Sequence, residues 1–118
     1  MFSGIVIKGD GVARKLGYPT ANLSVGPKET KLKDGIYAAL AVIAKKKYEA
    51  ALVVHSSANK VEVHLFEYRG KDIYGSRLSV DAVQKVSEIE RMPEADLKKK
   101  IDNDIRLIRE FFKNGEEV

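Results

Sequence analysis

Alternation of apolar and polar residues is the dominant pattern over the first 90 residues of the chain. It is clearest in residues 60–68, where two sets of side chains would lie on opposite faces of a strand. One set is Val61, Val63 and Leu65, and the other is Glu62, His64 and Phe66. Residues 2–8, 35–44 and 48–55 predict further strands, and residues 77–89 predict one or two more. Several antiparallel strands at this spacing in a small domain imply a closed barrel or a sandwich.

Near the C-terminus, the spacing of apolar residues changes to that of a helix. An apolar stripe recurs at helical spacing and is formed by Leu97, Ile101, Ile105, Ile108 and Phe112. Pro93 suits the first turn of a helix, and Gly115 can end one. We therefore expect a helix over about residues 93–113, packed against a barrel that spans about residues 1–90.

Composition indicates one domain over residues 1–118. The chain has 44% hydrophobic and 32% charged residues, which is enough for a single core. It has no cysteine, which excludes a disulfide framework, a thiolate metal site and a cysteine nucleophile. No apolar run approaches the roughly 20 residues of a membrane span, and the N-terminus lacks the apolar core of a signal peptide. We expect a cytoplasmic monomer with no membrane partner.

The charge balance favours an anionic partner such as a nucleotide. Twenty-one Lys and Arg residues against seventeen Asp and Glu residues give a formal net charge of +4. Residues 45–47 are all lysine and suit a hairpin turn, and the lysines at 98–100 lie on the predicted helix among many acids. Stacking aromatics are not interleaved with these cations. A basic barrel that binds nucleic acid is therefore the weakest interpretation, and no nucleic-acid partner is expected.

A segment near the N-terminus combines three glycines with two cations: Gly9, Gly11 and Gly17 with Arg14 and Lys15. Glycines let the backbone approach a ligand closely, and the cations can neutralise phosphate. The segment predicts a flap that binds a polyphosphate, although it completes neither the dinucleotide-binding nor the P-loop pattern. From composition alone, a surface loop with two solvated cations explains it equally well.

The residues after this flap predict a cation site in a turn. Pro19 keeps the preceding residue extended, so Thr20 and Asn22 fall at alternate positions and can point to the same side. Their neutral oxygens suit a magnesium ion that phosphate already holds. The chain has only two histidines and no cluster of acids at ligand spacing, so we do not expect a transition-metal site made by the protein alone.

Four segments, in order along the chain, resemble the riboflavin kinase family. The first runs from Gly9 to the Pro-Thr-Ala-Asn-Leu of residues 19–23. The others are residues 34–38 (Asp-Gly-Ile-Tyr-Ala), 61–66 (Val-Glu-Val-His-Leu-Phe) and 72–75 (Asp-Ile-Tyr-Gly), and a helix pattern of Leu97, Ile101 and Asp104 follows them. The resemblance covers nearly the whole chain. It implies a mainly β fold, a small closed Greek-key-like antiparallel barrel of about six strands with the C-terminal helix packed on it.

The resemblance also implies an activity and its residues. Riboflavin kinases use Mg²⁺ and ATP to phosphorylate the 5′-hydroxyl of riboflavin, giving FMN and ADP. The nucleotide and its phosphates would contact Gly9, Gly11, Arg14, Lys15, Gly17, Thr20 and Asn22, and the metal would contact Thr20 and Asn22. Glu62 would be the base that accepts the hydroxyl proton. Without the resemblance, Glu62 is more simply a solvated strand carboxylate, and His64 receives only a packing role.

Two segments depart from the family pattern. Residues 53–60 are shorter than the usual loop. Residues 86–92 (Val-Ser-Glu-Ile-Glu-Arg-Met) lack Arg and Phe at the places that the family pattern Ile/Leu-Arg-x-Glu-x-Lys-Phe gives them on the flavin side of its site. A different class of function therefore stays open: a flavin- or nucleotide-binding sensor module with weak catalysis. The family's adenylyltransferase region does not precede this sequence, so we do not expect FAD synthesis.

Overall fold

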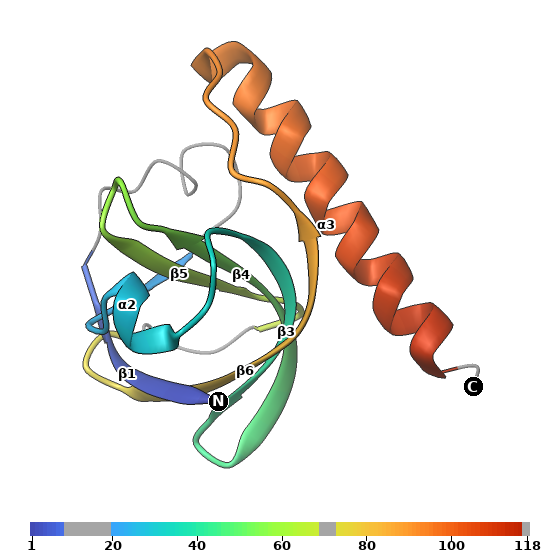
Figure 1. Ribbon diagram of the computed structural model, residues 1–118. Helices are drawn as coiled ribbons and strands as arrows, with labels where there is room; N and C mark the ends of the chain where they lie inside the picture. Colours follow the sequence, from blue (N-terminus) through green and yellow to red (C-terminus); the bar gives the residue numbers. More distant parts are fainter. Residues whose placement is uncertain (9–19, 69–72, 117–118) are drawn as a thin grey trace.

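A closed antiparallel β-barrel with a long helix against its outer wall forms the structure, which is a computed structural model (Figure 1). It describes residues 1–8, 20–68 and 73–116. The strands are β1 (Phe2–Ile7), β2 (Ala21–Leu23), β3 (Gly35–Ile43), β4 (Lys46–His55), β5 (Lys60–Leu65) and β6 (Arg77–Ser87). The helices are α2 (Pro27–Thr30) and α3 (Glu94–Glu116). The prediction of a mainly β barrel with a C-terminal helix is confirmed.

The order of strands around the barrel is β1-β2-β5-β4-β3-β6, and every neighbouring pair is antiparallel. The short strand β2 closes the gap between β1 and β5, because Leu23 pairs with Val6 and Asn22 pairs with Glu62. This register brings residues 20–22 beside the middle of β5. The barrel topology therefore places two segments that are about 40 residues apart in sequence next to each other.

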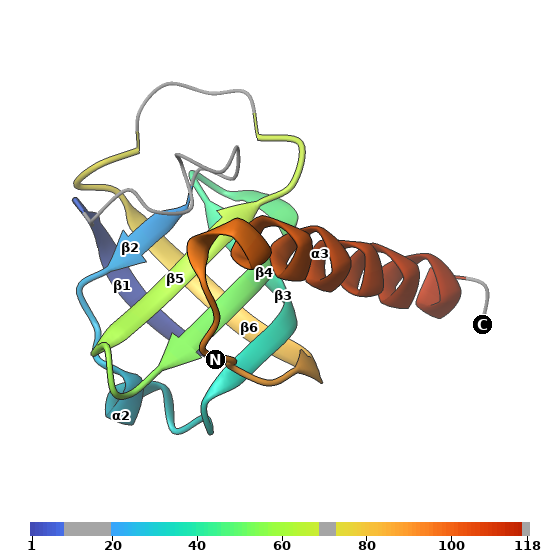
Figure 2. The same cartoon turned by 90° about the horizontal axis from the view of Figure 1, so that it is seen from above.

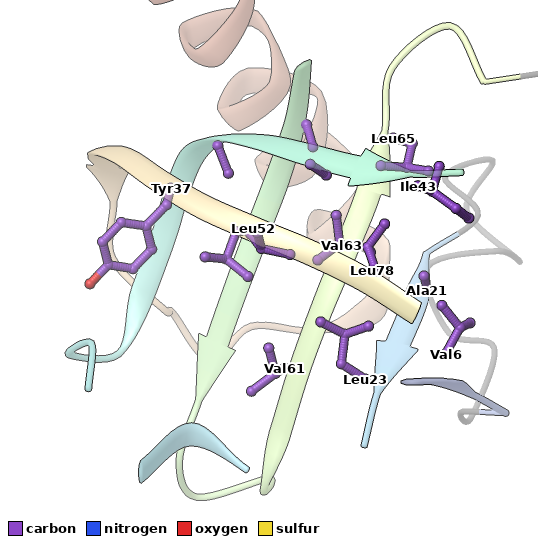
Figure 3. Close-up of a cluster of buried hydrophobic side chains, with 14 of the residues drawn as sticks. Val6, Ala21, Leu23, Tyr37, Ile43, Leu52, Val61, Val63, Leu65 and Leu78 are labelled. Carbon is purple, nitrogen blue, oxygen red and sulfur yellow. The ribbon is translucent and has the colours of Figure 1, made fainter. Parts of the chain in front are cut away.

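The interior of the barrel is filled by the apolar side chains of alternating strand positions (Figure 3). Val61, Val63 and Leu65 of β5 all point inward and are at most 9% exposed. Leu52 and Leu78 contribute the largest side chains with no exposed surface. The predicted division of residues 60–65 into two faces is thus confirmed, and the polar face of β5 lies on the outside of the barrel.

Tight turns join the central strands. Ala44 and Lys45 both have positive φ, 50° and 68°, and connect β3 to β4 in the two-residue geometry that matches the twist of a hairpin. The predicted hairpin at residues 45–47 is present, with Lys46 and Lys47 already paired in β4. Residues 56–59 turn β4 into β5, and Asn59 donates its backbone N–H to the carbonyl of Ser56 at 3.0 Å.

Helix α3 packs on the outside of the barrel and forms a second, smaller core there. Ile108 is completely buried against Ile36, Ala38, Ala51 and Phe66 of the barrel wall. Figure 2 shows that the C-terminal half of α3 extends beyond the barrel. The helix begins at Glu94 and reaches Glu116, so Gly115 lies within its last turn instead of ending it. No helix among the described residues is both long enough and apolar enough to span a membrane.

Two short elements were not expected from the pattern of residues. Residues 21–23 form strand β2 and not a turn, and they are held by pairing to both neighbours. Helix α2 is a single turn that begins at Pro27, where the carboxylate of Glu29 accepts the N–H of Gly26 at 2.9 Å. Elements of three or four residues are too short for a periodic signal, so pairing and capping decide them.

Candidate active site

A cavity of about 640 Å³ lies between the outer face of the barrel and α3. Its apolar lining comes from three sources: Ile36, Ala51 and Val53 of the barrel wall, Ile89 and Met92 of the β6–α3 connection, and Leu97, Ile101 and Ile105 of α3. Polar residues at its wall include Thr20, His55, Lys60, Glu62 and His64. Concave, mostly apolar sites with a few convergent polar groups are typical of sites for small organic ligands.

Glu62 is the carboxylate that strand β5 contributes to this cavity. The hydroxyl of Thr20 donates a hydrogen bond to Oε2 of Glu62 at 2.9 Å, and Nζ of Lys60 lies 4.0 Å from Oε1. The Glu62 side chain is only 14% exposed. Strand β5 positions it, since its neighbours Val61 and Val63 are anchored in the barrel interior. A carboxylate that is held at one oxygen and lines an apolar cavity has the placement that a general base needs.

Thr20 and Asn22 meet Glu62 from the adjacent strand. Asn22 is the direct pairing partner of Glu62 across β2 and β5, and Thr20 bonds its carboxylate. The hydroxyl of Thr20 and the amide oxygen of Asn22 are hard oxygen donors that suit Mg²⁺, and Mg²⁺ usually takes few protein ligands when a nucleotide supplies phosphate oxygens. This donor set fits the metal. Among the described residues, no three His, Cys, Asp or Glu side chains cluster closely enough to hold a metal by themselves.

The predicted phosphate flap lies outside the described residues. Its members are Gly9, Gly11, Arg14, Lys15 and Gly17. The described chain stops at Lys8 after β1 and resumes at Thr20, which lines the cavity. The nucleotide-binding role of these five residues therefore stays a prediction, and so do the roles of Thr20, Asn22 and Glu62.

His64 lines the same cavity but belongs to a packing arrangement. Its ring meets that of Phe66 edge-to-face with centroids 5.6 Å apart, and the guanidinium of Arg109 lies 4.4 Å above the Phe66 ring. Arg109 also approaches Glu67 at 3.4 Å. These contacts join α3 to the end of β5, which agrees with the packing role expected for His64.

Sequence reasoning missed a polar cluster on the helix side of the cavity. Lys100 belongs to a run of lysines that suggests a solvated surface, yet its side chain is only 13% exposed and its ammonium group contacts Asp104 and Ser87. In the sequence, Asp104 stands out only as part of the helix pattern. Because Lys100 and Asp104 are four residues apart, they share one helix face with Leu97, Ile101 and Ile108, and this spacing was the available signal.

The altered segment at residues 86–92 forms one wall of the cavity, because residues 88–92 all line it. Lys85 bonds Glu88 at 2.8 Å, and this contact raises the pKa of Lys85 above its ordinary value. Asp34, which precedes β3, accepts hydrogen bonds from the hydroxyl and the backbone N–H of Ser56, which follows β4, and the hydroxyl bond lowers the Asp34 pKa. Both contacts lie at the surface beside the cavity.

Comparison with known proteins decides the family. The model of the family described as "Flavokinase: Riboflavin kinase" matches residues 1–112. The chain belongs to the riboflavin kinase family. The recognition made from the sequence is therefore confirmed.

Two curated relatives are each 32% identical to this riboflavin kinase family member over 120 residues. One is the RNA-binding riboflavin kinase RibR of Bacillus subtilis, with 95% of this chain and 51% of the relative covered. The other is the bifunctional riboflavin kinase/FMN adenylyltransferase of Buchnera aphidicola subsp. Schizaphis graminum, with 93% and 38% covered. The chain thus spans about half or less of the length of these relatives.

Solved structures support the fold of this family member. The riboflavin kinase of Trypanosoma brucei superposes with a TM-score of 0.71 over 94% of this chain and 75% of the other, at 17% identity, which shows the shared fold. A structure described as a macrolide-efflux protein from Streptococcus pneumoniae gives a TM-score of 0.75 at 26% identity, over 91% of this chain and 37% of the other.

Proposed function

We propose that this protein is a riboflavin kinase that transfers the γ-phosphate of ATP to the 5′-hydroxyl of riboflavin, releasing FMN and ADP. The observation that carries the proposal is the position of Glu62. Its carboxylate is bonded by Thr20 at 2.9 Å and lines a cavity whose remaining walls are largely apolar. One end of the cavity can thus bind an alcohol, while the rest suits a flat aromatic ring.

Glu62 acts as the general base in this proposal. Its carboxylate accepts the proton of the 5′-hydroxyl while the hydroxyl oxygen forms a new bond to the γ-phosphorus. The bond from the γ-phosphorus to the bridging oxygen of ADP breaks, and ADP leaves with that oxygen. Phosphoryl transfer needs little further chemistry from the protein beyond alignment and compensation of charge. Thr20 holds one carboxylate oxygen of Glu62 and so orients the other.

The phosphate side of the site is assigned to the flap and to β2. Gly9, Gly11, Arg14, Lys15 and Gly17 bind the polyphosphate of ATP in this proposal. Thr20 and Asn22 would hold Mg²⁺, and the ion would compensate the negative charge of the phosphates. Asn22 pairs with Glu62 across β2 and β5, so the strand register places the proposed metal ligands beside the proposed base.

The apolar part of the cavity takes the ring system of riboflavin. Ile36, Val53 and Ile101 approach it from the barrel and from α3, and a volume of about 640 Å³ lies within the range of pockets for ligands of this size. The wall of the cavity formed by residues 88–92 belongs to the 86–92 segment, which differs from the family pattern. We therefore assign binding of the ring mainly to side chains of the barrel and of α3.

The decisive test is FMN formation from riboflavin and Mg-ATP by the wild type and by Glu62→Gln, measured by chromatography with fluorescence detection. General base catalysis contributes about 10²–10⁴-fold, so the nearly isosteric variant should lose that much of kcat while it keeps its affinity for nucleotide. Equal turnover by both proteins would overturn the assignment of the base. If the folded wild type binds flavin but forms no FMN, the protein is a binding or sensor module.

The partner predictions need separate tests. The RNA-binding description belongs to the relative from Bacillus subtilis, of which this chain covers 51%. We propose that this chain has no nucleic-acid partner and is a monomer. Binding to oligonucleotides that weakens steeply with salt would contradict the first statement, and light scattering would test the second.

A further inference from the structure

A buried polar cluster on the helix side of the cavity is made by Ser87, Lys100 and Asp104. Nζ of Lys100 lies 2.5 Å from Oδ2 of Asp104 and 2.6 Å from Oγ of Ser87. Its two charged side chains are 13% and 7% exposed, and both Lys100 and Asp104 line the cavity. The cluster joins the end of β6 to α3. It is therefore a built feature of the wall and not a surface ion pair.

One atom of this cluster lacks a partner. Oδ1 of Asp104 is buried and accepts no hydrogen bond from any of the described residues. A buried carboxylate oxygen without a donor is unfavourable, because it loses its bonds to water and gains none from the protein. Since Asp104 lies at the cavity wall, a ligand in the cavity can supply the missing donor after a small adjustment of the side chain.

Lys100 adds a donor beside this acceptor. An ammonium group has three N–H bonds, and the contacts with Asp104 and Ser87 use two of them within the described part of the chain. The wall thus offers an acceptor and a donor side by side. A cationic ligand group would be repelled by Lys100 and an anionic one by Asp104. The complementary chemistry is a neutral group in which an N–H stands next to a carbonyl.

We propose that Lys100 and Asp104 determine specificity by binding the N–H and an adjacent carbonyl of the pyrimidinedione ring of the flavin. Asp104 accepts the ring N3–H, and Lys100 donates to the neighbouring carbonyl oxygen. This inference rests on the proposed function, since it assigns the ring of riboflavin to the same cavity. It supplies recognition on α3 in a chain whose 86–92 segment departs from the family pattern at the positions of its Arg and Phe.

The test compares riboflavin with riboflavin methylated at N3, which carries no N3–H. Dissociation constants are measured by quenching of flavin fluorescence on the wild-type protein in the presence of Mg-ADP, so that turnover is not needed. A hydrogen bond to a charged group corresponds to roughly a tenfold or larger change in affinity. We expect the methylated flavin to bind at least about tenfold more weakly.

A double variant separates recognition from the bulk of the methyl group. Lys100→Met with Asp104→Leu replaces both charges together and leaves no single buried charge behind. The two flavins should then bind the double variant with nearly equal dissociation constants. The matched control is Lys98→Met with Asp102→Leu, since this pair has the same i,i+4 spacing on α3 but side chains 57% and 45% exposed. The control should keep the wild-type preference.

Three outcomes overturn the inference. They are equal binding of both flavins by the wild type, an unchanged preference in the folded double variant, and loss of the preference in the control. In each case riboflavin still binds, so the proposed function stands. Failure of riboflavin itself to bind, together with absence of FMN formation, would overturn the proposed function as well. If the double variant does not fold, Lys100→Ala with Asp104→Ala replaces it, because this pair also removes both hydrogen-bonding groups, and an unchanged preference there also overturns the inference.

Discussion

The inner and outer faces of strands β4 and β5 differ in polarity and in exposure to solvent, although successive residues of the same two strands form both faces. The inner face is made of Leu52, Val54, Val61 and Val63, all at most 2% exposed and all apolar. The outer face carries four polar residues of the cavity, His55, Lys60, Glu62 and His64. One pair of strands therefore supports the barrel with one face and the candidate chemistry with the other.

This difference shows how a chain of 118 residues fits a ligand site without losing its core. A closed barrel fills its own interior, so its outer wall needs cover only where the sequence is apolar. Helix α3 covers that part and forms the second core around Ile108. The polar residues of the outer wall line the cavity between the barrel and α3.

The largest expected effect comes from the inner face. Leu52→Ala removes a side chain with no exposed surface and leaves a void in the barrel. The free energy of unfolding should fall by about 2–5 kcal/mol. Denaturation in urea measures this loss, and the affinity of the remaining folded protein for riboflavin should stay unchanged, because Leu52 points away from the cavity.

The neighbouring residue provides the matched control. Val53 follows Leu52 on β4, is partly buried and lines the cavity. Val53→Ala should cost only about 1 kcal/mol of stability, since the methyl groups it removes are incompletely buried, but it should weaken riboflavin binding. If Leu52→Ala weakened binding as much as Val53→Ala, the two faces would not act independently.

A smaller effect is expected where β2 meets the outer face. Thr20→Val keeps the shape of the side chain and removes the hydroxyl that bonds Glu62. Loss of a hydrogen bond to a charged group should lower kcat/KM for FMN formation by roughly ten- to a hundredfold. Thr20→Ser retains the hydroxyl and should recover most of the activity. A Thr20→Val protein with the kcat/KM of the wild type would contradict the proposed role of Thr20.

The smallest effect lies at the surface, beside the cavity. The hydroxyl of Ser56 holds the pKa of Asp34 below its ordinary value of 3.8. A carboxyl group whose pKa is lower in the folded protein than in the unfolded chain stabilises the fold at pH values above the unfolded pKa. This stabilisation is lost as the pH falls through the folded pKa. Ser56→Ala should therefore be slightly less stable than the wild type above about pH 4. Melting curves at several pH values should converge in more acidic solution, and a constant difference would contradict this linkage.

The sequence predicted the strands whose two faces differ strongly. Residues 60–65 and the stripe of α3 follow their periods of two and 3.6 closely, because each element has one buried side. Strand β2 and helix α2 could not be predicted this way, since three or four residues are too few to show a period. The burial of Lys100 was also hidden, because a run of three lysines resembles a solvated helix face.

For the candidate site, the sequence led to the hypothesis that Glu62, Thr20 and Asn22 are functional, but it did not show their proximity. Their proposed roles come from the resemblance of two motifs to those of the riboflavin kinase family. The motifs are about 40 residues apart in sequence, and the antiparallel register of β2 and β5 brings them together. His55 and Lys60 carried no signal, and they line the cavity only because a four-residue turn follows β4.

The sequence by itself determined the longer strands, helix α3 and their buried faces, because local periodicity and turn residues act over short stretches of chain. It also determined the family, because the motifs are matched residue by residue. Only the tertiary structure decided which polar side chains share the cavity and which of them are removed from water. Those properties depend on the closure of the barrel and the docking of α3, and each results from contacts between residues far apart in sequence.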